Sequence, residues 1–295
     1  MKILFIGCVM SSYVFLENLI KNGAEVVGII TKESSEFNSD FKDITPLCIE
    51  NGIPYICVKN INEASAIDFI MDKKPDIGYC LGWSQLVKEK VMELFPMGMV
   101  GYHPAALPYN RGRHPIIWAL ALGLKSTASS FFMIEKDADT GDIVSQRPVE
   151  ITYDDNAETL MNKLLKCGAE QIVELTMDIE NNTVERIPQI KSEGNSWRKR
   201  GKDDGQIDWR MSSRAIYNLV RALTRPYIGA HFVVRDKEIK VWAVREIECC
   251  NGKYDNIEPG KIISITNDSF IIKTGENLIE VLESEPVELT VGDYL

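Results

Sequence analysis

The chain has 295 residues, which suits one large domain or two unequal ones and is enough to bury a substantial core. With 45% hydrophobic and 26% charged residues, its composition excludes a disordered chain, a collagen-like chain and a disulfide mini-protein. Its 33 Lys and Arg against 43 Asp and Glu give a net charge of −10, which disfavours bulk nucleic-acid binding unless a local basic patch overrides it.

The apolar runs, the first eight residues and the cysteines indicate the cellular compartment of the protein. No apolar run reaches the roughly 18 residues of a membrane span. Residues 1–8 lack the basic flank and cleavage site of a signal peptide, so we expect a cytoplasmic protein with no membrane partner. Seven cysteines without a CxxC pair fit reduced thiols, and the adjacent Cys249 and Cys250 are expected at a strand end. Three histidines are too few for a His-rich zinc site, so no metal is expected.

The first 190 residues alternate between strand and helix patterns. Short apolar or β-branched runs predict strands at 2–6, 25–31, 54–58, 76–81, 97–102, 129–134 and 142–151. Apolar residues at helical spacing predict helices at 11–22, 45–50, 63–72, 87–94, 116–122 and 157–179. This alternation predicts an α/β domain, residues 1–190, with a Rossmann-like, doubly wound parallel sheet.

Composition changes after this domain. Residues 191–204 crowd Lys, Arg, Asp, Ser and Gly without periodicity, which predicts an exposed linker. Residues 205–295 show one helical pattern, followed by short alternating runs separated by turn residues. They predict a helix at 213–223 and strands at 230–234, 239–244, 261–266, 269–274 and 278–283. Several short strands of this kind favour a small C-terminal β-barrel.

Residues 101–118 are the candidate chemical site. The loop after the first strand, residues 7–12, lacks the GxGxxG spacing of a dinucleotide site, and the chain has no GxxxxGK[ST] phosphate loop. By contrast, residues 101–118 are rich in Pro, Gly and Arg and carry His103 at a predicted strand end, with Asp139 in a later turn. A histidine near a carboxylate is the arrangement that general acid–base chemistry requires.

Several segments together form a recognisable pattern. They are HPAALPYNRG at 103–112, Trp118 and DTGDI at 139–143, then WRKR at 197–200, DGQIDW at 204–209 and VRALTRPYIGA at 220–230. With this pattern the chain resembles the folate-dependent formyltransferase family over essentially its whole length. It is most similar to sugar N-formyltransferases, above all the domain that formylates UDP-4-amino-4-deoxy-L-arabinose, and also resembles methionyl-tRNA formyltransferase. The resemblance implies the formyltransferase fold with an OB-like C-terminal domain.

The resemblance also implies roles for particular residues in moving a formyl group from 10-formyltetrahydrofolate to a primary amine. His103 would transfer the proton and help to stabilise the oxyanion, and Asp139 would favour its imidazolium form. The implied folate-binding residues are Gln85, Leu86 and Val87 on one side of the pterin ring and Glu135, Lys136, Asp137, Ala138 and Asp139 on the other. The implied acceptor-binding residues are Arg111, Gly112, Arg113 and Trp118.

One catalytic position departs from the family pattern. Gly101 stands where the family has an asparagine that polarises the formyl carbonyl, and such a donor contributes roughly 2.7–4 kcal/mol to transition-state stabilisation. Three explanations stay open. Protonated His103 with a backbone N–H or water takes over, a hydroxyl of Thr127, Ser129 or Ser130 substitutes, or the protein binds without transferring.

The acceptor is expected to be a nucleotide-linked amino sugar, formylated for a surface polysaccharide or glycan. Methionyl-tRNA is the alternative acceptor. Binding of tRNA would need a basic surface and an insertion in the catalytic domain, and neither the −10 charge nor the short run from Tyr109 to His114 fits this. A catalytically impaired folate- or nucleotide-binding homologue is the third hypothesis. The basic run 197–202 is either a diphosphate site or a solvated linker. Because members of the family form dimers, a homodimer stays open.

Overall fold

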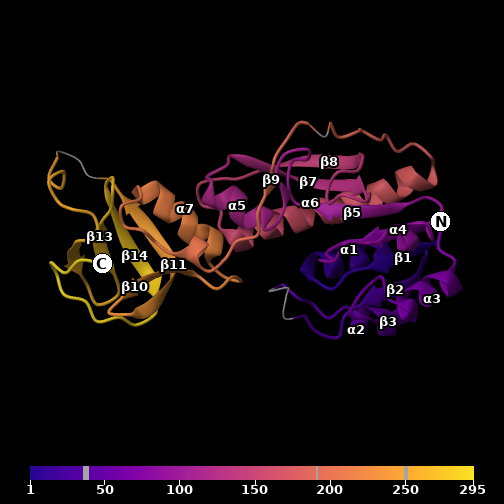
Figure 1. Cartoon of the computed structure of the whole chain (residues 1–295), viewed down its shortest axis with the longest axis horizontal. Coiled ribbons are helices and arrows are strands. Elements are labelled where there is room, and N and C mark those ends of the chain that lie inside the picture. Colours follow the sequence, from indigo (N-terminus) through magenta and orange to yellow (C-terminus); the bar gives the residue numbers. More distant parts are fainter. Residues whose placement is uncertain (36–39, 191, 249–251) are drawn as a thin grey trace. The chain divides into compact units, whose positions relative to one another are not determined.

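The computed structural model describes residues 1–35, 40–190, 192–248 and 252–295 (Figure 1). It divides into two compact units, the first made of residues 1–115, 127–149 and 162–197 and the second of residues 116–126, 150–161 and 198–295. The predicted strand end at Cys249 and Cys250 lies outside the described residues. Among the helices of the described part, none is both long and apolar enough to cross a membrane.

A seven-stranded sheet forms the centre of the first unit. Its order is β3 (Tyr55–Cys57), β2 (Val26–Thr31), β1 (Ile3–Ile6), β4 (Ile77–Cys80), β5 (Met99–His103), β7 (Ser126–Met133) and β8 (Ile143–Glu150). The first five strands are parallel, which confirms the predicted Rossmann-like sheet. Strand β7 runs antiparallel to β5, so the sheet is mixed at that side. The pairing places Ser130 opposite His103 and Phe132 opposite Gly101.

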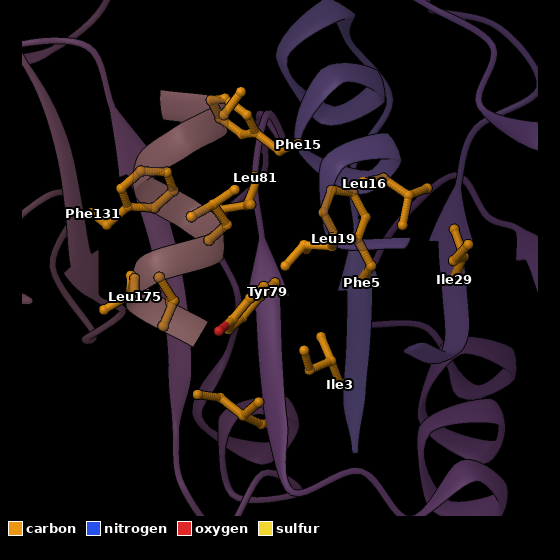
Figure 2. Packing of buried hydrophobic residues seen from close by; sticks show 14 of the residues in the cluster. Ile3, Phe5, Phe15, Leu16, Leu19, Ile29, Tyr79, Leu81, Phe131 and Leu175 are labelled. Atoms are coloured by element: carbon orange, nitrogen blue, oxygen red, sulfur yellow. The ribbon is translucent and has the colours of Figure 1, made fainter. Parts of the chain in front are cut away.

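Helices alternate with the strands along the first 180 residues of the chain (Figure 1). They are α1 (Met10–Lys21), α2 (Thr45–Glu50), α3 (Ala64–Lys73), α4 (Glu89–Met92), α5 (Pro115–Ala121) and α6 (Ala157–Glu180). One buried cluster joins the sheet to α1 and α6, and it includes the labelled residues of Figure 2 such as Phe5, Leu16 and Leu175. Within it, the Tyr79 hydroxyl is 2.9 Å from the Thr176 hydroxyl, so even the polar tip of this buried ring has a partner. This packing fixes the strand ends that carry the candidate site.

The second unit contains η1 (Asp203–Gly205), α7 (Ser213–Leu223) and a five-stranded antiparallel sheet. The sheet order is β10 (Ala230–Val234), β11 (Lys237–Ile247), β14 (Leu278–Ser284), β13 (Phe270–Lys273) and β12 (Ile262–Ile265), which is consistent with the predicted small barrel. Helix α7 has the predicted bounds, and the Ser212 hydroxyl accepts a bond from Ala215 N at its start.

Two short strands were not predicted from the sequence. Strand β6 (Arg111–Gly112) pairs in parallel with β9 (Ser196–Trp197). Each has only two residues, too few for a periodic signal. Residues 196–197 lie inside the predicted linker 191–204, of which residue 191 is outside the described part. In the structure they pack on the loop that follows β5.

Candidate active site

His103 ends strand β5 at the carboxyl edge of the sheet, where open α/β folds bind their ligands. The side chain is buried, with 5% of the residue exposed. Its Nε2 is 2.8 Å from the backbone oxygen of Asn110. A carbonyl oxygen only accepts hydrogen bonds, so Nε2 must donate. In a neutral ring, Nδ1 therefore carries the lone pair.

Asp139 faces the other nitrogen of that ring. Its Oδ2 is 3.8 Å from Nδ1 of His103, too far for a direct hydrogen bond but within the range of an ion pair with a protonated ring. The same oxygen accepts a bond of 3.0 Å from the backbone N–H of Gly112. An imidazolium at His103 would donate to Asn110 and face the carboxylate at once. The pair is therefore suited to accept and hold a proton at Nδ1.

The Arg-Gly-Arg loop supplies the support for Asp139. Gly112 has φ +96°, and a Cβ there would lie 2.4 Å from the backbone oxygen of Trp197, so the pairing of β6 with β9 requires glycine. Arg111 is 7% exposed, and its guanidinium donates to Oε1 of Gln189 at 3.1 and 2.8 Å. Arg113 is exposed, with Nη2 3.5 Å from the backbone oxygen of Ser84. The three residues thus lie in one loop but face different surroundings.

The position that departs from the family pattern is closed by an aromatic ring. Gly101 and His103 lie on the same face of β5, because they are two residues apart in a strand. A Cβ on Gly101 would lie 2.8 Å from Cζ of Phe132 and 3.1 Å from Cγ1 of Ile134. The space beside Gly101 is therefore occupied by hydrocarbon and not by a hydrogen-bond donor.

The three candidate hydroxyls are not directed to replace that donor. Thr127 donates to the backbone oxygen of Pro104 at 3.2 Å, and Ser130 donates to that of Ala105 at 2.6 Å. Each hydroxyl has one hydrogen, which these bonds use. Ser129 lies on the opposite face of β7 from Ser130, the partner of His103. Of the open explanations, substitution by a hydroxyl is therefore disfavoured.

Side-chain hydrogen bonds hold the first loop predicted to bind folate, residues 85–87. Gln85 donates to the backbone oxygen of Lys59 at 2.7 Å and accepts from Ile61 N at 3.3 Å. The side chain of Asn62 donates to the backbone oxygen of Leu86 and accepts from Lys88 N. Leu86 itself is 65% exposed, whereas Val87 is buried. A fixed loop thus presents one apolar side chain, which suits the face of an aromatic ligand.

The second predicted folate segment follows β7. Glu135, Lys136, Asp137 and Ala138 are all exposed, and the chain turns back at Asp139, which has φ +59°. The hydroxyl of Thr140 donates to the backbone oxygen of Asp137 at 3.0 Å and closes this turn. The folate-binding roles of these residues stay predictions.

Trp118 belongs to the second unit. Its Nε1 donates to the backbone oxygen of Arg198 at 3.0 Å. The guanidinium carbons of Arg198 and Arg200 lie 5.3 and 4.5 Å from the centre of its ring. These contacts hold the residue within that unit, and its role in acceptor binding stays a prediction.

Sequence reasoning missed two residues that contact the site. Asn110 has φ +64°, a conformation that asparagine tolerates better than most residues, and its place in a Pro- and Gly-rich loop was the only signal. Gln189 contacts both Arg111 and the Asp139 turn, yet nothing in its neighbourhood marks it. Over the part of the chain that the structure describes, no three His, Cys, Asp or Glu side chains are grouped to hold a metal ion.

Known protein families share this architecture. Residues 1–176 match the family described as formyl transferase, and residues 199–290 match its C-terminal domain. The chain belongs to the formyltransferase family. This confirms the family predicted from the motifs. Methionyl-tRNA formyltransferase of Alkaliphilus oremlandii is 30% identical over 302 residues, which span 100% of this chain and 96% of that protein.

Solved structures resemble the formyltransferase at lower identity. The N-formyltransferase from Helicobacter canadensis, in complex with folinic acid and dTDP-3-aminofucose, has a TM-score of 0.70 and 19% identity over 96% of this chain and 99% of that one. HypX from Aquifex aeolicus in complex with tetrahydrofolic acid has a TM-score of 0.66 and 17% identity. The match covers 95% of this chain but spans only 43% of HypX. At these identities the likeness shows a shared fold.

Proposed function

We propose that this formyltransferase moves the formyl group of 10-formyltetrahydrofolate to the primary amine of a nucleotide-linked amino sugar. The observation that carries the reaction is the relation between His103 and Asp139. The bond to Asn110 fixes the proton on Nε2, so Nδ1 is the basic atom, and it lies 3.8 Å from a carboxylate oxygen. A general base next to an anion is what an attacking amine needs.

The steps follow from this geometry. The amine attacks the formyl carbon, a C–N bond forms, and the carbonyl electron pair moves to oxygen. The proton leaving the amine nitrogen passes to Nδ1 of His103, and the imidazolium is stabilised by Asp139. The oxygen electron pair then re-forms the carbonyl, the bond from the formyl carbon to the folate nitrogen breaks with its electron pair on nitrogen, and His103 returns the proton to that nitrogen. With Gly101 lacking a donor, the charged imidazole is also the group proposed to stabilise the oxyanion.

The folate is proposed to lie between the two segments described above. The exposed Leu86 would cover one face of the pterin ring and residues 135–138 the other. Arg113, exposed beside Ser84, would meet an anionic part of a substrate. Arg111 is bonded within the protein, so its proposed contribution is to hold the loop in shape.

The charge of residues 198–295, the largest part of the second unit, favours a small acceptor over tRNA. Residues 198–295 carry 15 Lys and Arg against 16 Asp and Glu, so they offer no net positive charge to a phosphate backbone. Several of their cations are also paired with carboxylates, as in Arg198–Asp204, Lys202–Glu238, Arg210–Asp208, Arg214–Glu246, Arg225–Glu283 and Arg245–Glu280. The pairs at Arg198 and Lys202 favour the linker interpretation of the basic run over a diphosphate site.

Methionyl-tRNA is the second candidate acceptor. One observation favours it: curated relatives with 26–30% identity over 96–100% of this chain are methionyl-tRNA formyltransferases. The deciding experiment supplies 10-formyltetrahydrofolate with UDP-, dTDP-, GDP- and CMP-linked amino sugars and with methionyl-tRNA, and follows acceptor mass. A formyl gain on one sugar nucleotide supports the proposal, whereas a gain on the tRNA alone overturns it.

Variants test the chemistry in the same assay. We expect Asp139→Asn to fold normally and to lose about 100-fold or more in turnover, because a neutral amide does not stabilise the imidazolium. Asp72→Asn, which removes an exposed carboxylate on α3, is the matched control and should keep full turnover. If folate binds but no acceptor gains mass, the protein is the impaired homologue suggested by Gly101.

A further inference from the structure

The side-chain amide of Gln189 uses both of its N–H donors and accepts two hydrogen bonds at its oxygen. It lies beyond α6, in a segment fixed by reciprocal 2.9 Å bonds between the backbones of Ile187 and Ile143. Its Nε2 donates to the backbone oxygens of Asp139 at 3.0 Å and Gly141 at 2.7 Å. Its Oε1 accepts from Nε and Nη2 of Arg111 at 3.1 and 2.8 Å. One amide therefore makes four bonds to two different loops.

Both loops help to position the carboxylate of Asp139. The Asp139 backbone has φ +59°, a left-handed conformation that is unfavourable for most residues with a side chain. The bonds from Gln189 to the carbonyls of Asp139 and Gly141 hold this turn. On the other loop, Arg111 precedes Gly112, whose N–H binds Oδ2 of Asp139. Gln189 thus holds Asp139 directly at its backbone and, through Arg111 and Gly112, at its carboxylate.

We propose that Gln189 is a positioning residue that sets the Asp139 carboxylate against Nδ1 of His103. This inference rests on the proposed function, since it assigns Gln189 a part in the same proton transfer. The requirement is for an amide. Glutamate at this position could accept from Arg111 but would turn a carboxylate toward two carbonyl oxygens, and methionine would fill the space with no polar bond.

The variants Gln189→Met and Gln189→Glu test this requirement. We expect kcat to fall about 100-fold in Gln189→Met, the scale of loss that a small misplacement of a reacting group causes, with KM for 10-formyltetrahydrofolate unchanged. Gln189→Glu should lose kcat similarly at neutral pH. Its rate relative to wild type should rise at acid pH, because a protonated carboxyl regains one donor. A residue that only stabilised the fold would leave the kcat of the folded enzyme unchanged in both variants.

The matched control is Gln171→Met. Gln171 is a buried glutamine of the first unit, and its Nε2 donates to the Ser129 backbone oxygen and the Ser145 hydroxyl. Neither of these groups is hydrogen-bonded to Asp139 or Arg111. This variant should keep the wild-type kcat even if it is less stable. Equal losses of kcat in Gln171→Met and Gln189→Met would overturn the proposal.

A second measurement separates this proposal from the proposed function. The chain has only three histidines, so ¹⁵N imidazole signals are few, and His103→Gln assigns those of His103. In Gln189→Met, the His103 signals should shift while those of His231, which lies in the second unit, stay in place. If wild type formylates no acceptor, the proposed function fails, and unchanged His103 signals in Gln189→Met would overturn the positioning role independently.

Discussion

The ring of Phe132 takes the space into which a side chain at position 101 would project, since a Cβ on Gly101 would lie 2.8 Å from its Cζ. Phe132 is itself buried, beside Leu107 and Ile143. Overpacking of this kind costs typically about 1–3 kcal/mol. We therefore expect Gly101→Asn to lower the free energy of unfolding by that amount and to leave turnover no faster, as measured by urea denaturation and the formyl-transfer assay.

The double variant Gly101→Asn with Phe132→Leu supplies the control. Leucine removes the ring atoms nearest to position 101, so the two changes should destabilise less together than the sum of the single changes. Faster transfer in the double variant would indicate that an amide at 101 can still polarise the formyl group. Faster transfer in Gly101→Asn alone would contradict the steric account.

Gly112→Ala should reduce both stability and turnover. The Cβ would lie 2.4 Å from the Trp197 backbone oxygen, so β6 must separate from β9 and the N–H bond to Asp139 is lost. Gly23→Ala is the matched control, because Gly23 also has positive φ but nothing within 4 Å of its Cβ. It should cost only the left-handed conformation, about 1–2 kcal/mol, with unchanged kcat. Similar kcat values in both variants would show that turnover does not depend on the hydrogen bond from the Gly112 N–H to Asp139.

Leu86→Ala tests the proposed folate surface. The side chain is 65% exposed, so its loss should leave the unfolding free energy almost unchanged. If it covers a pterin ring, KM for 10-formyltetrahydrofolate should rise about tenfold, because burying a leucine contributes at least about 1.5 kcal/mol. Ile49→Ala, at an equally exposed position on α2, should change neither quantity. A normal KM in Leu86→Ala would remove this residue from the site.

The lowered pKa of His231 predicts that the free energy of unfolding depends on pH. Burial lowers the pKa of this imidazole below its ordinary value of 6.5, although the Glu238 carboxylate, 3.9 Å away, opposes the shift. The unfolded chain therefore takes up the proton at higher pH than the folded one. The stability that neutral His231 contributes is complete above about pH 6.5 and is lost as the pH falls below it.

Urea denaturation of wild type and His231→Gln across this range measures the effect. The wild-type unfolding free energy should fall more steeply with acid than that of the variant, because the variant has no group to protonate there. Parallel curves would show that His231 titrates alike in both states.

The sequence alone determined most of the longer elements and the family. Helix α7 and strand β10 have the predicted bounds, and the motif around His103 matched the family that residues 1–176 and 199–290 confirm. These features are local, because periodicity, caps and contiguous motifs are written in neighbouring residues.

Only the tertiary structure decided which groups meet at the site. Gln189 lies 50 positions beyond Asp139, Asn195 lies 85 beyond Asn110, and the ring beside Gly101 comes from an antiparallel strand that the parallel pattern did not foretell. Such contacts depend on how segments distant in sequence pack, and no local pattern encodes the pairing. His103 and Asp139 could therefore be predicted from the sequence, whereas the residues that contact them, such as Asn110 and Gln189, follow only from the tertiary structure.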